Sequence, residues 1–246
     1  MVLRGDSRRS AVVPTSIMAC LRRALVAGAL AGLCAALYLL AVGERSLEAA
    51  LALEAPSSEP EMFSRGTQVA GGVVAAMLLG ILLSIVFGTV FAKLRHRLAG
   101  RDDLRRSLVL ATTGFVAVSL LPALKYPANP PGVGDPGNSG QRSLAYLLLV
   151  LAALALSIGI WGAYDWLHDR MNQPTAVVLT VVVGVTLTVA LLVAMPSPRL
   201  AIPETMPAGL LWRFRLHSIG SLVVLWATLG LAFGWLCSRN AAREQT

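Results

Sequence analysis

Residues 175–195 read TAVVLTVVVGVTLTVALLVAM, a run of 21 residues without one charged side chain. A helix needs about 20 mostly apolar residues to cross a bilayer, so this run is long enough to span one. A barrel strand would alternate apolar and polar residues over about ten positions, and this run does not. The stretch therefore predicts a transmembrane helix.

Five further runs share this character. They cover residues 24–42, 69–92, 107–124, 144–164 and 217–237. Of the whole chain, 56% is hydrophobic and 14% is charged, against about 25% charged residues in a typical soluble domain. The pattern predicts an all-α fold, a polytopic transmembrane bundle of about six helices within a domain at 18–238.

The basic residues gather in alternate connections. The two terminal segments, the second connection and the fourth connection hold 14 of them: Arg4, Arg8, Arg9, Arg22, Arg23, Lys93, Arg95, Arg97, Arg101, Arg105, Arg106, Arg170, Arg239 and Arg243. The other loops hold seven. By the positive-inside rule both termini are cytoplasmic, with residues 239–246 as a cytoplasmic tail. This alternation explains the net charge of +8 without nucleic-acid binding.

The N-terminus admits two start sites. Residues 1–17 form a polar segment, which we expect to be a disordered extension, and Met18 offers a second start that keeps Arg22 and Arg23. The first apolar run is longer than the 7–15 residues of a signal-peptide core, so we interpret it as a retained helix.

Small residues recur four positions apart in several predicted spans. Gly28 and Gly32, Gly230 and Gly234, and the series Gly80, Ser84 and Gly88 follow this spacing. Small faces let helix backbones approach closely in lipid, which predicts a compact bundle. No ionisable residue lies near the centre of a span, which argues against a self-sufficient ion pump.

Three unusual segments fall on the predicted external side. Residues 121–136, LPALKYPANPPGVGDP, contain five prolines and predict a rigid non-helical loop. That loop is either a stiff cap on a hairpin or a lining of an external vestibule. The segments LLWRFRLHSIG at 210–220 and SRGTQ at 64–68 lie beside it in the predicted topology.

The loop after the first apolar run is acidic, with Glu44, Glu48, Glu54, Glu59 and Glu61. This acidic first loop and the three segments supply the candidate vestibule residues. They are Glu48, Glu54, Arg65, Lys125, Tyr126, Asn129, Asp135, Arg142, Trp212, Arg213, Arg215 and His217. Because basic residues on this side oppose the topology trend, we expect acidic partners for them: Arg213 or Arg215 contacts Glu48 or Glu54. The alternative is that each arginine snorkels to lipid phosphate.

No set of residues in this chain predicts a catalytic centre, a cofactor site or a metal site. The three histidines are scattered, the three cysteines show no CxxC pairing, and no HExxH, P-loop or GxSxG motif occurs. The chain is therefore not expected to be an enzyme, and its metal ligands stay unassigned.

The 121–136 loop, the SRGTQ segment, the acidic first loop, Arg142 with Tyr146, and LLWRFRLHSIG together resemble the CbtA family of bacterial membrane proteins. The resemblance implies a multi-pass subunit of a cobalt transporter in the bacterial cytoplasmic (inner) membrane. It also implies Co²⁺ as substrate and CbtB, a small His-rich single-span membrane protein, as partner. The alternatives are a non-transporting membrane scaffold or assembly protein, or a transporter of another cation.

Overall fold

A computed structural model describes residues 17–53, 63–134, 139–197 and 202–243. Within them the elements are helical: α1 (Ile17–Tyr38), η1 (Leu39–Gly43), α2 (Glu44–Leu51), α3 (Arg65–Leu94), α4 (Asp103–Gly114), η2 (Phe115–Leu120), α5 (Leu121–Lys125), α6 (Ser139–His168), α7 (Gln173–Ala194) and α8 (Ala208–Arg243). The expected disorder of residues 1–17 falls, apart from Ile17, outside the described residues. The all-α prediction is confirmed for the described part of the chain.

Six helices in the described ranges are long and apolar enough to cross a membrane. They run from Ile17 to Leu51, Arg65 to Leu94, Asp103 to Lys125, Gly140 to His168, Gln173 to Ala194 and Ala208 to Arg239. The first contains the π-helical segment η1 and the third contains η2, so each continues through a change of helix type. The helices extend past the apolar runs because backbone hydrogen bonding continues where hydropathy ends.

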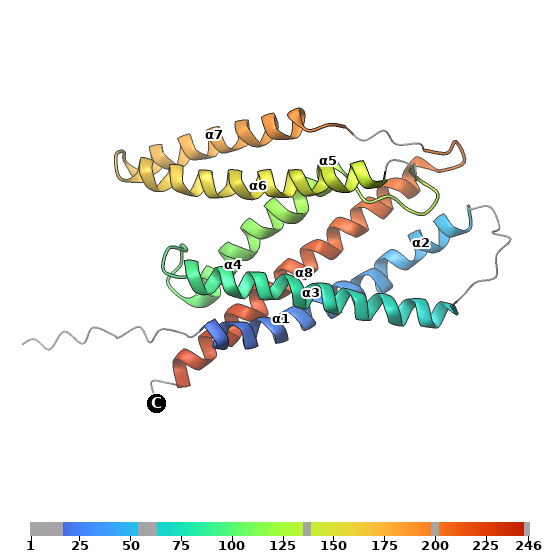
Figure 1. The fold of residues 1–246 in the computed structure, drawn as a ribbon, viewed down its shortest axis with the longest axis horizontal. Helices are drawn as coiled ribbons and strands as arrows, with labels where there is room; N and C mark the ends of the chain where they lie inside the picture. Colours follow the sequence, from blue (N-terminus) through green and yellow to red (C-terminus); the bar gives the residue numbers. More distant parts are fainter. Residues whose placement is uncertain (1–16, 54–62, 135–138, 198–201, 244–246) are drawn as a thin grey trace, which may run out of the picture.

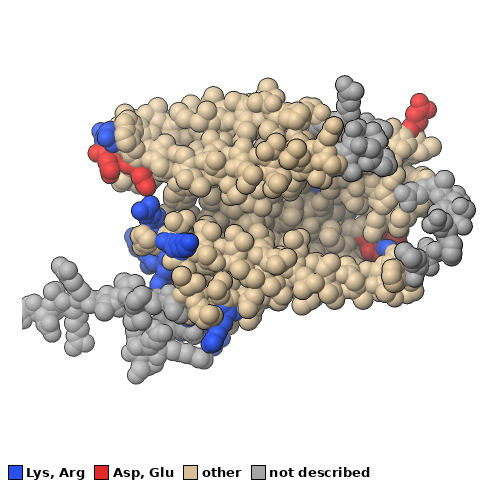
Figure 2. Space-filling view, in the orientation of Figure 1, with Lys and Arg blue, Asp and Glu red and all other residues tan. Residues whose placement is uncertain are grey.

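The helices cross the bundle in alternating directions (Figure 1). The start of α1, the end of α8 and the connections 95–102 and 169–172 lie at one end, which we name the basic end. α2, the start of α8 and the loop at residues 126–134 lie at the opposite end, which we name the cavity end. Figure 2 shows Lys and Arg side chains concentrated at the basic end.

Small residues bring α1 and α3 into close contact. A Cβ atom built on Gly28 would lie 2.5 Å from the Gly80 carbonyl oxygen, and one on Gly80 would lie 2.3 Å from the Gly28 oxygen. A Cβ on Gly32 would lie 2.3 Å from the Ala76 oxygen. Because no side chain fits between these backbones, the predicted small faces pack against each other inside the chain.

α8 lies between α1 and α4 and carries the core. A Cβ on Gly234 would lie 2.8 Å from the Cα atom of Leu104 in α4. Ser107 donates a hydrogen bond of 2.8 Å to the Gly230 carbonyl oxygen. The indole nitrogen of Trp226 donates one of 2.8 Å to the Ser119 hydroxyl in η2. These bonds satisfy polar groups that hydrocarbon would leave without partners.

α6 and α7 form an outer pair that packs on the third span. Ala153 of α6 packs with Ala117 and Leu121 of the third span. Elsewhere the pair exposes apolar side chains such as Ile158, which is 73% exposed, and Val193, which is 77% exposed. Such surfaces are unfavourable in water and match the acyl chains of a bilayer, so this arrangement suits a membrane bundle.

An acidic side chain organises the basic end. Asp103 accepts hydrogen bonds of 2.7 and 2.6 Å from Nε and one terminal nitrogen of Arg95, and Arg106 lies 3.6 Å away. The hydrogen bond to Asp103 raises the pKa of the Arg95 guanidinium, so this arginine stays charged. Asp102 caps α4 by accepting 2.8 Å from the Arg105 amide. The pairs fix the connection between α3 and α4.

Candidate functional site

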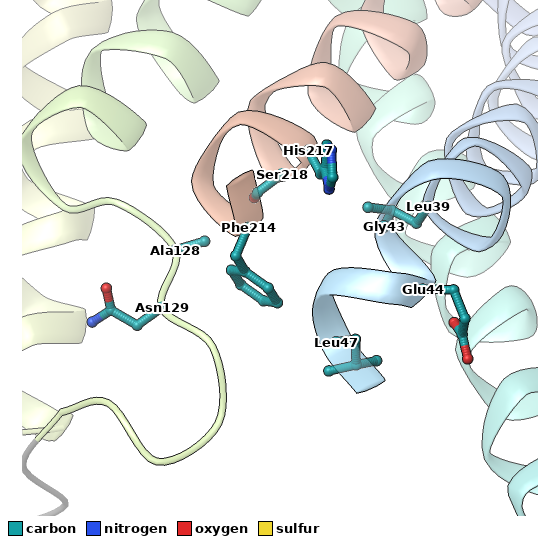
Figure 3. Close-up of a pocket in the computed structure, with 9 residues that line it drawn as sticks. All are labelled: Leu39, Gly43, Glu44, Leu47, Ala128, Asn129, Phe214, His217 and Ser218. Carbon is teal, nitrogen blue, oxygen red and sulfur yellow. The ribbon is translucent and has the colours of Figure 1, made fainter. Parts of the chain in front are cut away.

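A cavity of about 310 Å³ opens at the cavity end, between η1, α2, the start of α8 and the 126–134 loop (Figure 3). It is lined by Leu39, Gly43, Glu44, Leu47, Ala128, Asn129, Phe214, His217 and Ser218. The lining is mainly apolar and brings a few polar groups together, which is the usual composition of a binding pocket.

His217 supplies an imidazole to this cavity. Its Nδ1 lies 3.2 Å from the hydroxyl of Ser46, a buried residue of α2. Figure 3 shows the ring between α8 and η1. Since the hydrogen bond with Ser46 orients the ring through Nδ1, the other nitrogen, Nε2, is available as a donor or metal ligand.

Glu44 sits on the wall between this cavity and a second hollow. The second hollow has a volume of about 220 Å³ and shares Leu39, Glu44 and Leu47 with the first. Its other lining residues come from α1, η1 and α3. The carboxylate of Glu44 forms an ion pair with Arg65 at the start of α3. Figure 3 shows the Glu44 side chain turned toward α3, away from His217. The carboxylate is therefore close to the cavity and already paired.

The proline-rich segment 121–136 was predicted to be non-helical throughout, and this holds for the described residues 126–134. It is wrong for residues 121–125, which form the short helix α5 with Pro122 in its first turn, where proline is tolerated. The Tyr126 hydroxyl donates a hydrogen bond of 2.9 Å to the Pro196 carbonyl oxygen, and Lys125 Nζ donates one of 3.2 Å to Ser197. Burial raises the pKa of the Tyr126 phenol, which stays protonated as a donor. Ala128 lines the cavity, so the loop is part of its wall as well as a cap on the hairpin.

The predicted contact of Arg213 or Arg215 with Glu48 is wrong. Arg213 donates a bond of 3.3 Å to the Gly209 carbonyl in its own helix, and Arg215 donates one of 3.1 Å to Asn129 Oδ1. The buried face of α2 carries Ser46 and Ala50, and Ala50 packs on α8. Glu48 lies opposite that face and is exposed.

The remaining candidates divide by location. Trp212 is 62% exposed, on the surface of α8. Arg142 donates a bond of 2.9 Å to the Pro127 carbonyl oxygen, so it contacts the loop but not the cavity. Glu54 and Asp135 lie outside the described residues, and with them the alternative contacts of the arginines with Glu54. The sequence did not predict that Ser46 contacts His217, because the charged residues of α2 suggested a loop and not a helix.

Residues 17–238 match the family model described as "Probable cobalt transporter subunit (CbtA)". The chain belongs to the CbtA family. The match spans all six candidate membrane helices up to Ser238. Comparisons with curated proteins and with solved structures found no match. The family assignment makes the chain a multi-pass membrane protein of a transporter class.

In this CbtA protein the described residues hold no group of three or more His, Cys, Asp or Glu side chains that could bind a metal ion. Cys20 and Cys237 are free thiols buried near the basic end, far along the bundle from the cavity. A divalent cation prefers several protein ligands at once. The cavity offers one imidazole, that of His217, and one carboxylate, that of Glu44, which is paired with Arg65.

Proposed function

We propose that this CbtA-family chain is the polytopic subunit of a cobalt transporter in the bacterial cytoplasmic membrane. In this proposal Co²⁺ enters the cavity beside His217 from the external side. A small His-rich single-span partner of the CbtB type completes the coordination. The family match over residues 17–238 supports the transporter class. The imidazole of His217 and the carboxylate of Glu44 in the cavity support its use as the metal path.

The donor set favours a shared metal site. Co²⁺ is well suited to imidazole and carboxylate ligands, and His217 is the one imidazole that lines this cavity. Glu44 is paired with Arg65, so a cation has to compete with a guanidinium for that carboxylate. A cavity that offers one imidazole binds a metal weakly, which suits transient passage, and in this proposal the partner supplies the further ligands for capture.

The distribution of charge supports cytoplasmic termini. At the basic end the described residues include ten basic side chains: Arg22, Arg23, Lys93, Arg95, Arg97, Arg101, Arg105, Arg106, Arg170 and Arg239. Six lie toward the cavity end: Arg45, Arg65, Lys125, Arg142, Arg213 and Arg215. The positive-inside rule then places the basic end in the cytoplasm and the cavity outside. In this proposal residues 1–17 are a dispensable extension and residues 239–246 are the cytoplasmic tail.

Radioactive cobalt uptake tests the proposal. Cells that lack their own cobalt importer would express the chain alone, the partner alone, or both. We expect ⁵⁷Co²⁺ accumulation above background with both proteins and much less with either one. Competition with unlabelled Ni²⁺ and Zn²⁺ identifies the preferred metal.

Two outcomes would contradict the proposal. Equal background uptake in all cells, with both proteins verified in the membrane, would favour a scaffold or assembly protein. Uptake that is abolished by another metal at concentrations where unlabelled Co²⁺ has no effect would favour a transporter of that cation.

A further inference from the structure

Two arginines from different helices meet at the same short piece of the proline-rich loop. Arg142 of α6 contacts the Pro127 carbonyl oxygen at 2.9 Å. Arg215 of α8 contacts Asn129 Oδ1 at 3.1 Å. Pro127 and Asn129 are two residues apart, so both guanidinium groups contact the same short segment of the loop. A negative charge beside two like charges lowers the repulsion between them.

The same cluster contains hydrogen-bond donors without acceptors. The Nε atom of Arg215 and the Nδ2 atom of Asn129 are shielded from solvent and have no hydrogen-bond partner among the described residues. Both are N–H groups, and buried N–H groups without partners are rare in native proteins. None of the ion pairs found among the described residues includes Arg142 or Arg215. Among the described residues the cluster therefore has more positive charge and more hydrogen-bond donors than its neutral acceptors satisfy.

The basic end shows the contrasting arrangement. There Arg95 and Arg106 approach each other around Asp103, which accepts hydrogen bonds from Arg95 and neutralises part of the charge. In that case the carboxylate is part of the chain. At Arg142 and Arg215 the described residues supply only the neutral oxygens of Pro127 and Asn129. An anion from outside the described residues would take the position that Asp103 has at the other end.

We propose that a phosphate-type oxyanion binds between Arg142 and Arg215, with the Asn129 amide as a third donor. Planar guanidinium groups match the oxygen geometry of phosphate and form paired, charge-assisted hydrogen bonds with it. The anion is either the headgroup phosphate of an anionic phospholipid or free inorganic phosphate. Trp212, exposed near Arg215 on α8, and Tyr146, one turn beyond Arg142 on α6, fit the interface depth where lipid phosphates lie.

The proposed anion site adjoins the cation cavity and shares Asn129 with it. Arg142 and Arg215 do not line the cavity, and Asn129 lies at its edge. Figure 3 shows the Asn129 side-chain amide directed away from His217. An anion at this position holds the loop between α6 and α8 and thereby fixes one wall of the cavity. The proposed anion site does not depend on cobalt transport, because the two arginines that would bind the anion do not line the cavity.

Thermal stability of the purified full chain in uncharged detergent tests the proposal. Inorganic phosphate and phosphatidylglycerol would be titrated separately, with phosphatidylcholine as the lipid control. We expect at least one of the first two to raise Tm saturably. Arg215→Gln and Arg142→Gln should each weaken the apparent affinity by about tenfold or more, because each removes hydrogen bonds to a charged group. Arg213→Gln is the matched control, since Arg213 bonds its own helix.

The outcomes distinguish the sources of the anion. A Tm rise with phosphatidylglycerol alone identifies a lipid headgroup, and a rise with inorganic phosphate identifies a free anion. No rise with either, or equal loss in Arg213→Gln and Arg215→Gln, would overturn the proposal. A larger phosphate response in Asp135→Asn would also overturn it, because the chain's own carboxylate would then be the occupant. If Arg215→Gln does not fold, Arg215→Lys keeps the charge, loses the Nε donor and should still weaken binding.

Discussion

Replacement of Gly32 by alanine should separate α1 from α3. The added Cβ atom would lie 2.3 Å from the Ala76 carbonyl oxygen and 2.6 Å from the Met77 Cα atom. Both are backbone atoms of α3, so no side-chain rotation relieves the clash. The two helices have to move apart along the interface that also holds Gly28 against Gly80.

The expected cost follows from overpacking. Extra methyl groups in a well-packed interior cost about 1–3 kcal/mol, and backbone contacts belong to the upper part of that range. For a chain of this size about 2 kcal/mol lowers Tm by about 4–8 °C. Gly71→Ala on α3 is the matched control, because nothing lies within 4 Å of its added Cβ. Helices that stay formed in the membrane gain little from alanine's higher propensity, so Gly71→Ala should change Tm little.

Thermal unfolding in detergent, followed by size-exclusion chromatography with fluorescence detection, measures the difference. Gly32→Ala should unfold several degrees below both the wild type and Gly71→Ala. Equal Tm values for the two variants would refute the close packing of α1 on α3, and with it the account of the glycine faces.

Three other predictions concern the described residues. Asp103→Asn breaks the partly buried ion pair with Arg95 at the basic end and should lower the free energy of unfolding by about 3 kcal/mol. Asp102→Asn keeps a good helix cap and should lower it little in the same unfolding assay. Trp226→Phe removes a buried hydrogen bond to Ser119 in η2 and should lower the free energy of unfolding by about 1 kcal/mol. Trp212→Phe is the control, because it changes an exposed ring. Equal losses in the two variants would contradict the assigned bond. Arg101→Cys should resist impermeant thiol reagents added to intact cells and react after permeabilisation, and labelling of intact cells would invert the topology.

The six spans were predictable because each is a long apolar run, and lipid selects for such runs directly. Their true lengths were less evident. α2 carries Glu44 and Glu48 in the same helical run as α1, although its charges suggested a loop. Likewise Trp212 to Arg215 lie inside α8 and do not precede it. Hydropathy marks where lipid ends, whereas capping residues such as Ser64 mark where a helix begins.

The pairings at the cavity end were only partly predictable. Arg65 was expected to join an acidic network, and it pairs with Glu44. Arg215 instead contacts Asn129, which is 86 positions away in the sequence. Such contacts depend on how the loop folds across two helices, and no local pattern of charge encodes that path. The small-residue faces were predictable in position, but their partners within the chain became evident only from packing.

Initial rates of ⁵⁷Co²⁺ uptake for His217→Gln, co-expressed with the proposed His-rich partner, test the proposed metal path most directly. His96→Gln is the control, because His96 is exposed in the connection at the basic end. Loss of a metal ligand typically weakens function by about tenfold or more. We predict such a loss for His217→Gln at subsaturating Co²⁺, and wild-type rates for His96→Gln. Wild-type uptake by His217→Gln at equal membrane levels would contradict the account.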